Sequence, residues 1–206
     1  MIKKAPVAMK KADLSSEERI KEAARVVFTK KGYAATRTRD IATEAGMNLA
    51  LLNYYYRSKE KLFQQIMMEK LQLLFGVIAP IVNDEYTSLD QKIEMLAEKY
   101  IIMLLNNPDL PLFVLSEIRL NPDQFKKSLQ LEKLIRNSSL ITQLKQKRPD
   151  MNPLHFLMNL LGMTVFPFIS RPILFSSSQN DATQFAAMME ERKALIPKWV
   201  KAVLKV

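Results

Sequence analysis

The chain has 206 residues, of which 48% are hydrophobic, and it carries a formal net charge of +10 and no cysteine. This hydrophobic share is enough to bury a core, so we expect one or two folded domains. The lack of cysteine excludes disulfides, thiolate metal sites and cysteine nucleophiles. With one histidine, four glycines and no phosphate-binding loop, we expect no enzyme activity, no metal site and no cofactor.

The positive charge is concentrated near the N-terminus. Residues 1–57 hold 12 Lys and Arg against 6 Asp and Glu, which is +6 of the total. Such a surplus attracts nucleic acid, and it would also suit an anionic membrane surface. N-terminal lysines argue against a signal peptide, and the apolar stretch 154–169 is short for a membrane span and is interrupted by polar residues. We therefore expect a soluble cytoplasmic protein without a membrane-spanning part.

The chain opens with a predicted arm and a helix. Residues 1–13 carry four lysines and few large apolar groups, which indicates a mobile arm. Ser15 and Glu18 form a capping-box pattern. Apolar residues then recur at helical spacing from Ile20 to Phe28, and Gly32 is the expected C-terminal cap of this helix.

Two short helices are predicted on either side of Gly46. Thr36 is the expected N-cap of the first and Asn48 that of the second, and Ser58 caps a longer helix that ends at Pro80. In the second short helix, Met47, Leu52 and Tyr56 are expected to face inward. Two short helices broken at a glycine, followed by three tyrosines and a basic helix start, are the pattern of a helix-turn-helix that lies on DNA.

Residues 15–70 resemble the tetracycline-repressor (TetR) family of transcriptional regulators. The resemblance rests on the runs GYAATRTRDIATEAGM and LNYYYRSKEKLF and on their separation. It implies an all-α protein with a helix-turn-helix DNA-binding domain in residues 1–60. It further implies a helical domain for effector binding and dimerisation in residues 61–206.

The resemblance also implies a set of phosphate contacts, because hydroxyl and ammonium groups can donate to phosphate oxygens. Packing of the small domain is the alternative for the tyrosines, and it is the preferred role of Tyr56. The residues at the family's phosphate-contacting positions are Thr36, Thr38, Tyr54, Tyr55 and Lys59.

Base reading is expected from the same two short helices. After the cap at Asn48, the family commonly has a polar or basic residue, a glycine and a threonine, whereas this chain has Leu49, Ala50 and Leu51. Apolar side chains there can contact thymine methyl groups but cannot make bidentate hydrogen bonds. Residues that could bond base edges are Asn53, Arg39 and Arg37, and a solvated surface position is the alternative for the two arginines.

The remainder of the chain is helical by pattern, without strand-like alternation. The polar run 176–181 is the clearest loop, and prolines at 80, 108, 111, 122, 153, 167 and 172 mark most junctions. The expected helices span residues 88–106, 111–119, 122–147, 152–166 and 181–204.

Aromatic and methionine-rich faces of these helices predict a cavity for a mostly apolar effector, because a thioether side chain adapts to varied apolar shapes. Filling of an ordinary core explains each methionine equally well. The predicted pocket residues are Tyr100, Met103, Phe113, His155, Met158, Asn159 and Met163.

The last two helices predict a homodimer. The helix after residue 152 is apolar on nearly every side, which is more than one monomer would cover, and Pro197 is expected to bend or interrupt the final helix. Gly162 permits close approach at a two-fold axis or relieves crowding within the monomer. The predicted interface residues are Phe156, Gly162, Phe166, Phe185, Met188, Met189 and Trp199.

Together these features predict a dimeric, effector-responsive regulator that binds double-stranded operator DNA, most simply a repressor released by a small apolar molecule. The alternative is a helical interaction protein whose basic N-terminal part docks on an acidic partner or on a membrane surface.

Overall fold

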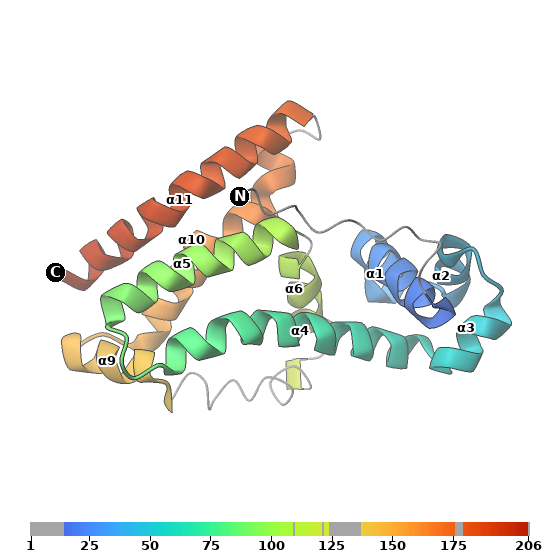
Figure 1. The fold of residues 1–206 in the computed structure, drawn as a ribbon, viewed down its shortest axis with the longest axis horizontal. Coiled ribbons are helices and arrows are strands. Elements are labelled where there is room, and N and C mark those ends of the chain that lie inside the picture. Colours follow the sequence, from blue (N-terminus) through green and yellow to red (C-terminus); the bar gives the residue numbers. More distant parts are fainter. Residues whose placement is uncertain (1–14, 109, 121, 124–136, 176–178, 206) are drawn as a thin grey trace, which may run out of the picture. The chain divides into compact units, whose positions relative to one another are not determined.

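The computed structural model describes residues 15–108, 110–120, 122–123, 137–175 and 179–205 (Figure 1). Every regular element in these ranges is a helix, so the all-α prediction is confirmed. The chain divides into two compact units, of which one ends at Glu69 and the other begins at Lys70. The helices are α1 (Ser16–Ala35), α2 (Thr38–Ala45), α3 (Leu49–Tyr56), α4 (Lys59–Asn83), α5 (Leu89–Asn106), α6 (Leu110–Leu120), α9 (Ser139–Lys147), α10 (Pro153–Leu174) and α11 (Gln179–Lys205).

Helix α1 begins as predicted. The Ser15 hydroxyl accepts a hydrogen bond from the Glu18 N–H at 3.2 Å, and the Glu18 carboxylate accepts one from the Ser15 N–H at 3.1 Å, so the capping box is confirmed. The apolar face from Ile20 to Phe28 is buried. Gly32 has a positive φ of 74° and breaks the helix, but helical backbone resumes after it instead of ending there.

The prediction of Thr36 as an N-cap is wrong. Helix α2 begins at Thr38 with Arg37 in the N-cap position, and the Asp40 carboxylate accepts from the Arg37 N–H at 2.9 Å. Thr36 instead lies at the end of α1, where it is buried and its hydroxyl donates to the Gly32 carbonyl at 2.6 Å. Because the chain leaves the helix here, that carbonyl lacks a helical partner, and the hydroxyl supplies one.

The starts of α3 and α4 follow their capping residues. The side-chain oxygens of Asn48 and Ser58 each accept from the main-chain N–H three residues on, at 2.8 and 3.2 Å. Both predicted caps are therefore confirmed. Within α3, Leu52 and Tyr56 are buried as predicted, while Met47 just before the helix is half-buried.

Three prolines that the sequence assigns to junctions lie inside helices. Pro80 is within α4, and Pro167 and Pro172 are within α10. Proline has no N–H, so Pro167 leaves the Met163 carbonyl without its helical partner. The guanidinium of Arg192 in α11 donates to that carbonyl at 2.8 Å, which stabilises the uninterrupted helix.

The remaining boundaries agree with prediction to within a few residues where they can be compared. The arm at 1–13 and residues 124–136 of the predicted helix 122–147 lie outside the described residues. The prediction of one continuous helix over 122–147 is wrong, because Ser138 is extended and its hydroxyl accepts from the Ile141 N–H at 3.4 Å, which starts α9 as a separate helix. Helix α11 starts inside the predicted loop 176–181, at Gln179, and continues through Pro197.

The core of the second unit forms around α5, which packs against α9, α10 and α11 (Figure 1). Ile93, Ile101 and Leu104 of α5 are buried in it with Leu144 of α9 and Ile196 of α11. These apolar side chains provide the main driving force for the unit.

A buried lysine joins α5 to α9. The ammonium of Lys92 donates to the Thr87 carbonyl, to the Ser139 hydroxyl at 3.3 Å and to the Gln143 side-chain oxygen at 3.0 Å. Burial lowers the pKa of Lys92, since the apolar surroundings disfavour its charged form. These three bonds satisfy all the ammonium donors, so the position is structural.

Helices α4 and α10 are long and apolar enough to cross a bilayer by length and composition. A core helix of a water-soluble protein passes the same test. In α4, Glu69 is ion-paired with Lys21 and Arg25 of α1, which identifies this part of α4 as an element of a folded unit.

Candidate nucleic-acid interface and ligand cavity

Helices α2 and α3 present polar and aromatic side chains to solvent. Arg37, Arg39 and Asn53 are exposed. Tyr54 is exposed at 77% and Tyr55 at 38%, and their rings meet edge to face with centroids 5.2 Å apart. Guanidinium, amide and phenol groups on one short segment can donate to phosphate oxygens or to base edges.

The turn between α2 and α3 is fixed by hydrogen bonds. Gly46 adopts a left-handed conformation with φ 65°, which ends α2, and the Met47 N–H donates to the Ala42 carbonyl at 2.9 Å. Arg19 of α1 donates from Nη2 to the Ala45 carbonyl at 3.1 Å. The end of α2 is thereby attached to α1, which sets where α3 begins.

The other residues predicted to face DNA lie around this turn. Asn48 and Ala50 are exposed, whereas Thr38 and Leu49 are half-buried. The Asn48 side-chain oxygen is used in the cap of α3, so its amide N–H groups are the part left for another contact.

Lys59 has a structural partner that the sequence does not reveal. Its ammonium donates to the carbonyls of Tyr33 and Thr36, both at 2.9 Å, and lies 4.2 Å from the centre of the Tyr33 ring. The first residue of α4 thus caps the end of α1. Two of its three donors are used here, and Thr36, which is buried at the same joint, has no exposed hydroxyl for a phosphate.

Further polar contacts fasten α1 to α3 and α4. The buried Tyr56 hydroxyl donates to the Glu17 carbonyl at 3.1 Å, and burial raises the pKa of Tyr56 to about 12. Burial alone would raise the pKa of Glu69, but hydrogen bonds from Lys21 and Arg25 outweigh it and lower that pKa. These contacts hold the short helices in one arrangement.

Residues 20–66 match the sequence model of bacterial regulatory proteins of the tetR family. This match supports a TetR-family transcriptional regulator. The chain is 24% identical over 162 residues to the probable HTH-type transcriptional regulator YttP of Bacillus subtilis (strain 168), and the alignment covers 76% of this chain and 78% of YttP. It is 29% identical over 77 residues to the HTH-type transcriptional repressor KstR2 of Mycolicibacterium smegmatis, and the alignment covers 37% of this chain and 38% of KstR2.

Solved structures share the fold of this chain. The fatty acid degradation regulator FadR from Bacillus halodurans has a TM-score of 0.61 at 18% identity, covering 95% of this chain and 96% of FadR. PfmR from Thermus thermophilus has a TM-score of 0.63 at 19% identity, covering 87% and 97%. FadR from Bacillus subtilis, solved in complex with stearoyl-CoA, has a TM-score of 0.59 at 16% identity, covering 87% and 96%.

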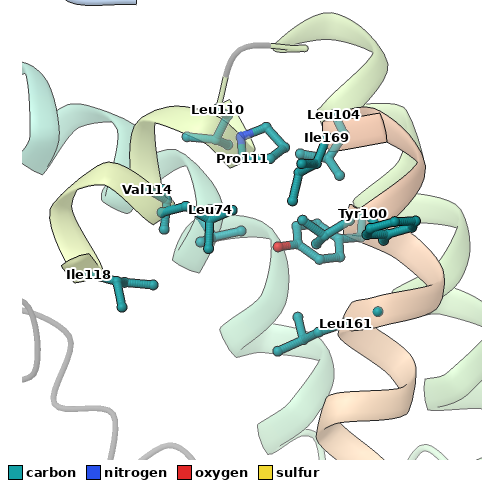
Figure 2. Close-up of a pocket in the computed structure, with 13 residues that line it drawn as sticks. Leu74, Tyr100, Leu104, Leu110, Pro111, Val114, Ile118, Leu161 and Ile169 are labelled. Atoms are coloured by element: carbon teal, nitrogen blue, oxygen red, sulfur yellow. The ribbon is translucent and has the colours of Figure 1, made fainter. Parts of the chain in front are cut away.

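The second unit contains a cavity of about 330 Å³ between α4, α5, α6 and α10 (Figure 2). This volume is near the lower end of ligand pockets. Among the residues that the structure describes, no group of three or more His, Cys, Asp or Glu could hold a metal ion. The cavity is lined by Leu74, Tyr100, Leu104, Leu110, Pro111, Val114, Leu115, Ile118, Leu161, Gly162, Val165, Phe166 and Ile169.

Of the predicted pocket residues, only Tyr100 lines this cavity. Met103 and Phe113 are buried in the core, and Met163 is half-buried. The other three predicted residues are exposed on the first two turns of α10. The walls are instead mainly branched aliphatic side chains on α6 and α10. Helix α10 is apolar on nearly all sides, so its sequence does not show which side faces the cavity. The three exposed residues are His155, Met158 and Asn159.

Of the residues predicted to form the dimer interface, some are exposed or half-buried and the others are buried in the core. Phe166 and Trp199 are exposed at 62% and 40%, Gly162 is exposed, and Met188 is half-buried. Gly162 and Phe166 also line the cavity. The remaining three are buried in the core of their own chain, so their side chains are not available to a partner, and these are Phe156, Phe185 and Met189.

Proposed function

We propose that this TetR-family protein is a dimeric transcriptional repressor that leaves its operator when a small, mostly apolar molecule binds. One observation carries the DNA-binding part: residues that match the family form a helix-turn-helix whose exposed face bears hydroxyl, amide and guanidinium groups. The DNA-binding domain comprises residues 1–60, and residues 61–206 serve dimerisation and effector binding.

In this proposal Tyr54 and Tyr55 anchor the protein on phosphates, because their exposed hydroxyls need no rearrangement to donate. Thr38 assists from the start of α2, where helix N–H groups also favour a phosphate. Lys59 contributes one remaining donor and positive charge while it caps α1. Thr36 makes no phosphate contact in this proposal, since it is buried. It contributes to DNA binding only by holding Lys59 in place through its carbonyl.

Sequence discrimination is assigned to other side chains. Arg39, Arg37 and Asn53 are exposed and can bond base edges, with arginine suited to guanine and asparagine to adenine. Leu49 and Ala50 would contact thymine methyl groups. The exposed amide of Asn48 completes this DNA-binding face.

The dimer is proposed to form through exposed apolar side chains of α10 and α11. Phe166, Trp199 and Gly162 are exposed there, and Met188 is half-buried. An exposed apolar surface of this kind is stabilised by contact with another chain. Two-fold symmetry would place two recognition helices about 34–36 Å apart, on successive major grooves.

The cavity is proposed as the effector site. Its apolar walls suit an apolar ligand, and the related FadR from Bacillus subtilis was solved with stearoyl-CoA, a molecule that contains a long apolar chain. Release of DNA requires that the ligand bind more tightly to a conformation whose recognition helices are wrongly spaced. Such a switch needs no enzyme activity or cofactor, and it acts in the cytoplasm on double-stranded DNA.

A gel-shift experiment tests the proposal. The full-length protein should retard the DNA around its own gene in the presence of excess random competitor, and a footprint should show a pseudo-palindrome. Equal retardation of the gene's flanking DNA and random DNA would contradict a role as a specific regulator. A basic interaction protein would give that result.

A further inference from the structure

One polar atom stands apart in the apolar cavity. The Tyr100 hydroxyl is the only side-chain N–H, O–H or oxygen among its thirteen described lining residues. Figure 2 shows this hydroxyl pointing into the cavity, toward Leu74. It makes no hydrogen bond to another residue in the part of the chain that the structure describes. Since a phenol in apolar surroundings ordinarily has a hydrogen-bond partner, a ligand group can take that place.

The cavity offers nothing to balance a charge. None of the described residues that line it is ionised at neutral pH. Burial raises the pKa of Tyr100 to about 12, so its hydroxyl stays neutral and keeps its proton. A neutral phenol donates one hydrogen bond, which is too little to replace the hydration of a carboxylate or an ammonium group.

The shape of the cavity favours an elongated ligand. Its lining extends along α6 from Leu110 to Ile118 and along α10 from Leu161 to Ile169. Each of these stretches is about 12 Å long at the rise of an α-helix. Gly162 lies on the wall, and a Cβ added there would have no atom within 4 Å, so a larger side chain at this position would occupy free space.

We propose that the effector is an uncharged, elongated, mainly apolar molecule with one carbonyl or hydroxyl oxygen, which accepts a hydrogen bond from Tyr100. This inference rests on the proposed function, in which the cavity is the effector site. It assigns Tyr100 as the residue that selects for the polar group, whereas the apolar walls select for shape.

Three compounds with one carbon skeleton test this assignment by calorimetry on the full-length protein without DNA: pentylbenzene, its ketone valerophenone, and the carboxylate 5-phenylpentanoate. Valerophenone should bind at least about tenfold more tightly than the carboxylate, because the carboxylate loses its hydration without compensation. Tyr100→Phe should weaken valerophenone binding about 3- to 10-fold and change pentylbenzene binding less than twofold.

A second pair of variants locates the ligand. Gly162→Leu should weaken both neutral compounds at least about tenfold, because its side chain fills the cavity. Gly76→Leu is the matched control, since Gly76 is also helical with no atom within 4 Å of an added Cβ but does not line the cavity. Circular dichroism and melting temperature verify that each variant folds, and sedimentation verifies that each has the oligomeric state of the wild type, because Gly162 also lies on the proposed dimer face.

The inference is overturned by any of four results: the carboxylate binds as tightly as the ketone, Tyr100→Phe leaves the ketone unaffected, Gly162→Leu leaves both neutral compounds unaffected, or neither neutral compound binds. Release of operator DNA is measured separately. Binding with the expected Tyr100 and Gly162 dependence but without DNA release would support this assignment and contradict the proposed repressor switch.

Discussion

The helix-turn-helix and the cavity are built from opposite kinds of contact. Around the helix-turn-helix, Lys59, Arg19 and Glu69 make directional bonds that join one helix to another. The described cavity walls are apolar, and their one hydroxyl has no protein partner among the described residues. Directional bonds fix atoms in place, whereas apolar contacts specify mainly volume. The proposed DNA-reading surface is thus preorganised, and the proposed effector site can adapt.

The largest expected effect comes from separating the two subunits while the helix-turn-helix stays intact. Phe166→Glu combined with Trp199→Glu should give monomers and weaken operator binding about 100-fold, because a monomer engages one half-site at a time. Sedimentation and gel shift measure the two effects. Tyr86→Glu is the control, since Tyr86 is 99% exposed outside this face. A wild-type protein that sediments as a monomer at micromolar concentration would contradict the proposed dimer.

Replacing Lys59 by Met tests whether the hydrogen bonds between the start of α4 and the end of α1 stabilise the DNA-binding surface. Loss of the ammonium leaves the Tyr33 and Thr36 carbonyls without this donor, which should lower the free energy of unfolding by about 1–3 kcal/mol. Specific and random DNA should both bind more weakly, with a salt slope reduced by about one unit. Urea unfolding and salt titrations measure these effects, and an unchanged stability would show that the cap is unimportant.

Arg39→Ala and Asn53→Ala should act on sequence discrimination instead of overall binding. Each should lose about 1–3 kcal/mol of preference between the operator and a variant with the contacted base pair replaced, while affinity for random DNA changes little. Competition gel shifts with single-base operator variants measure this preference. Equal losses on operator and random DNA would reassign these residues to phosphate contacts.

The smallest expected effect concerns Glu69, whose folded-state pKa is lowered by Lys21 and Arg25 despite the opposing effect of burial. A lowered pKa contributes stability above the unfolded value, near 4.5, and this contribution is lost as the pH falls through the folded value. Glu69→Gln should therefore cost about 1 kcal/mol at pH 7, and less below about pH 4. Urea unfolding at both pH values, with Glu98→Gln as a surface control, measures it. A pH-independent difference would exclude the ion pairs as its cause.

The sequence predicts contacts between residues that are close along the chain. The capping box of Ser15 and Glu18 and the caps at Asn48 and Ser58 each involve atoms about one helical turn apart, so local side-chain chemistry determines them. The helix-turn-helix is recognisable for the same reason, because its short helices and glycine turn occupy one continuous segment.

Contacts between distant segments are not predictable in this way. Pro167 is expected to end a helix, yet Arg192 from α11 satisfies the carbonyl that it frees. Lys59 has the pattern of an exposed basic residue until α1 brings two carbonyls to it. The cavity depends on which sides of α6 and α10 meet, and a helix such as α10 that is apolar on nearly every side does not specify this.

The central claim is that the exposed tyrosine pair anchors a specific regulator on DNA, and one comparison tests it most directly. Affinities for the DNA around the gene are measured for the wild type, for Tyr54→Phe combined with Tyr55→Phe, and for Tyr86→Phe as an exposed control. The double variant, which loses only two hydroxyls, should bind about 10- to 100-fold more weakly, and the control should bind like the wild type. Wild-type affinity in the double variant, or no specific binding by the wild type, would contradict the account.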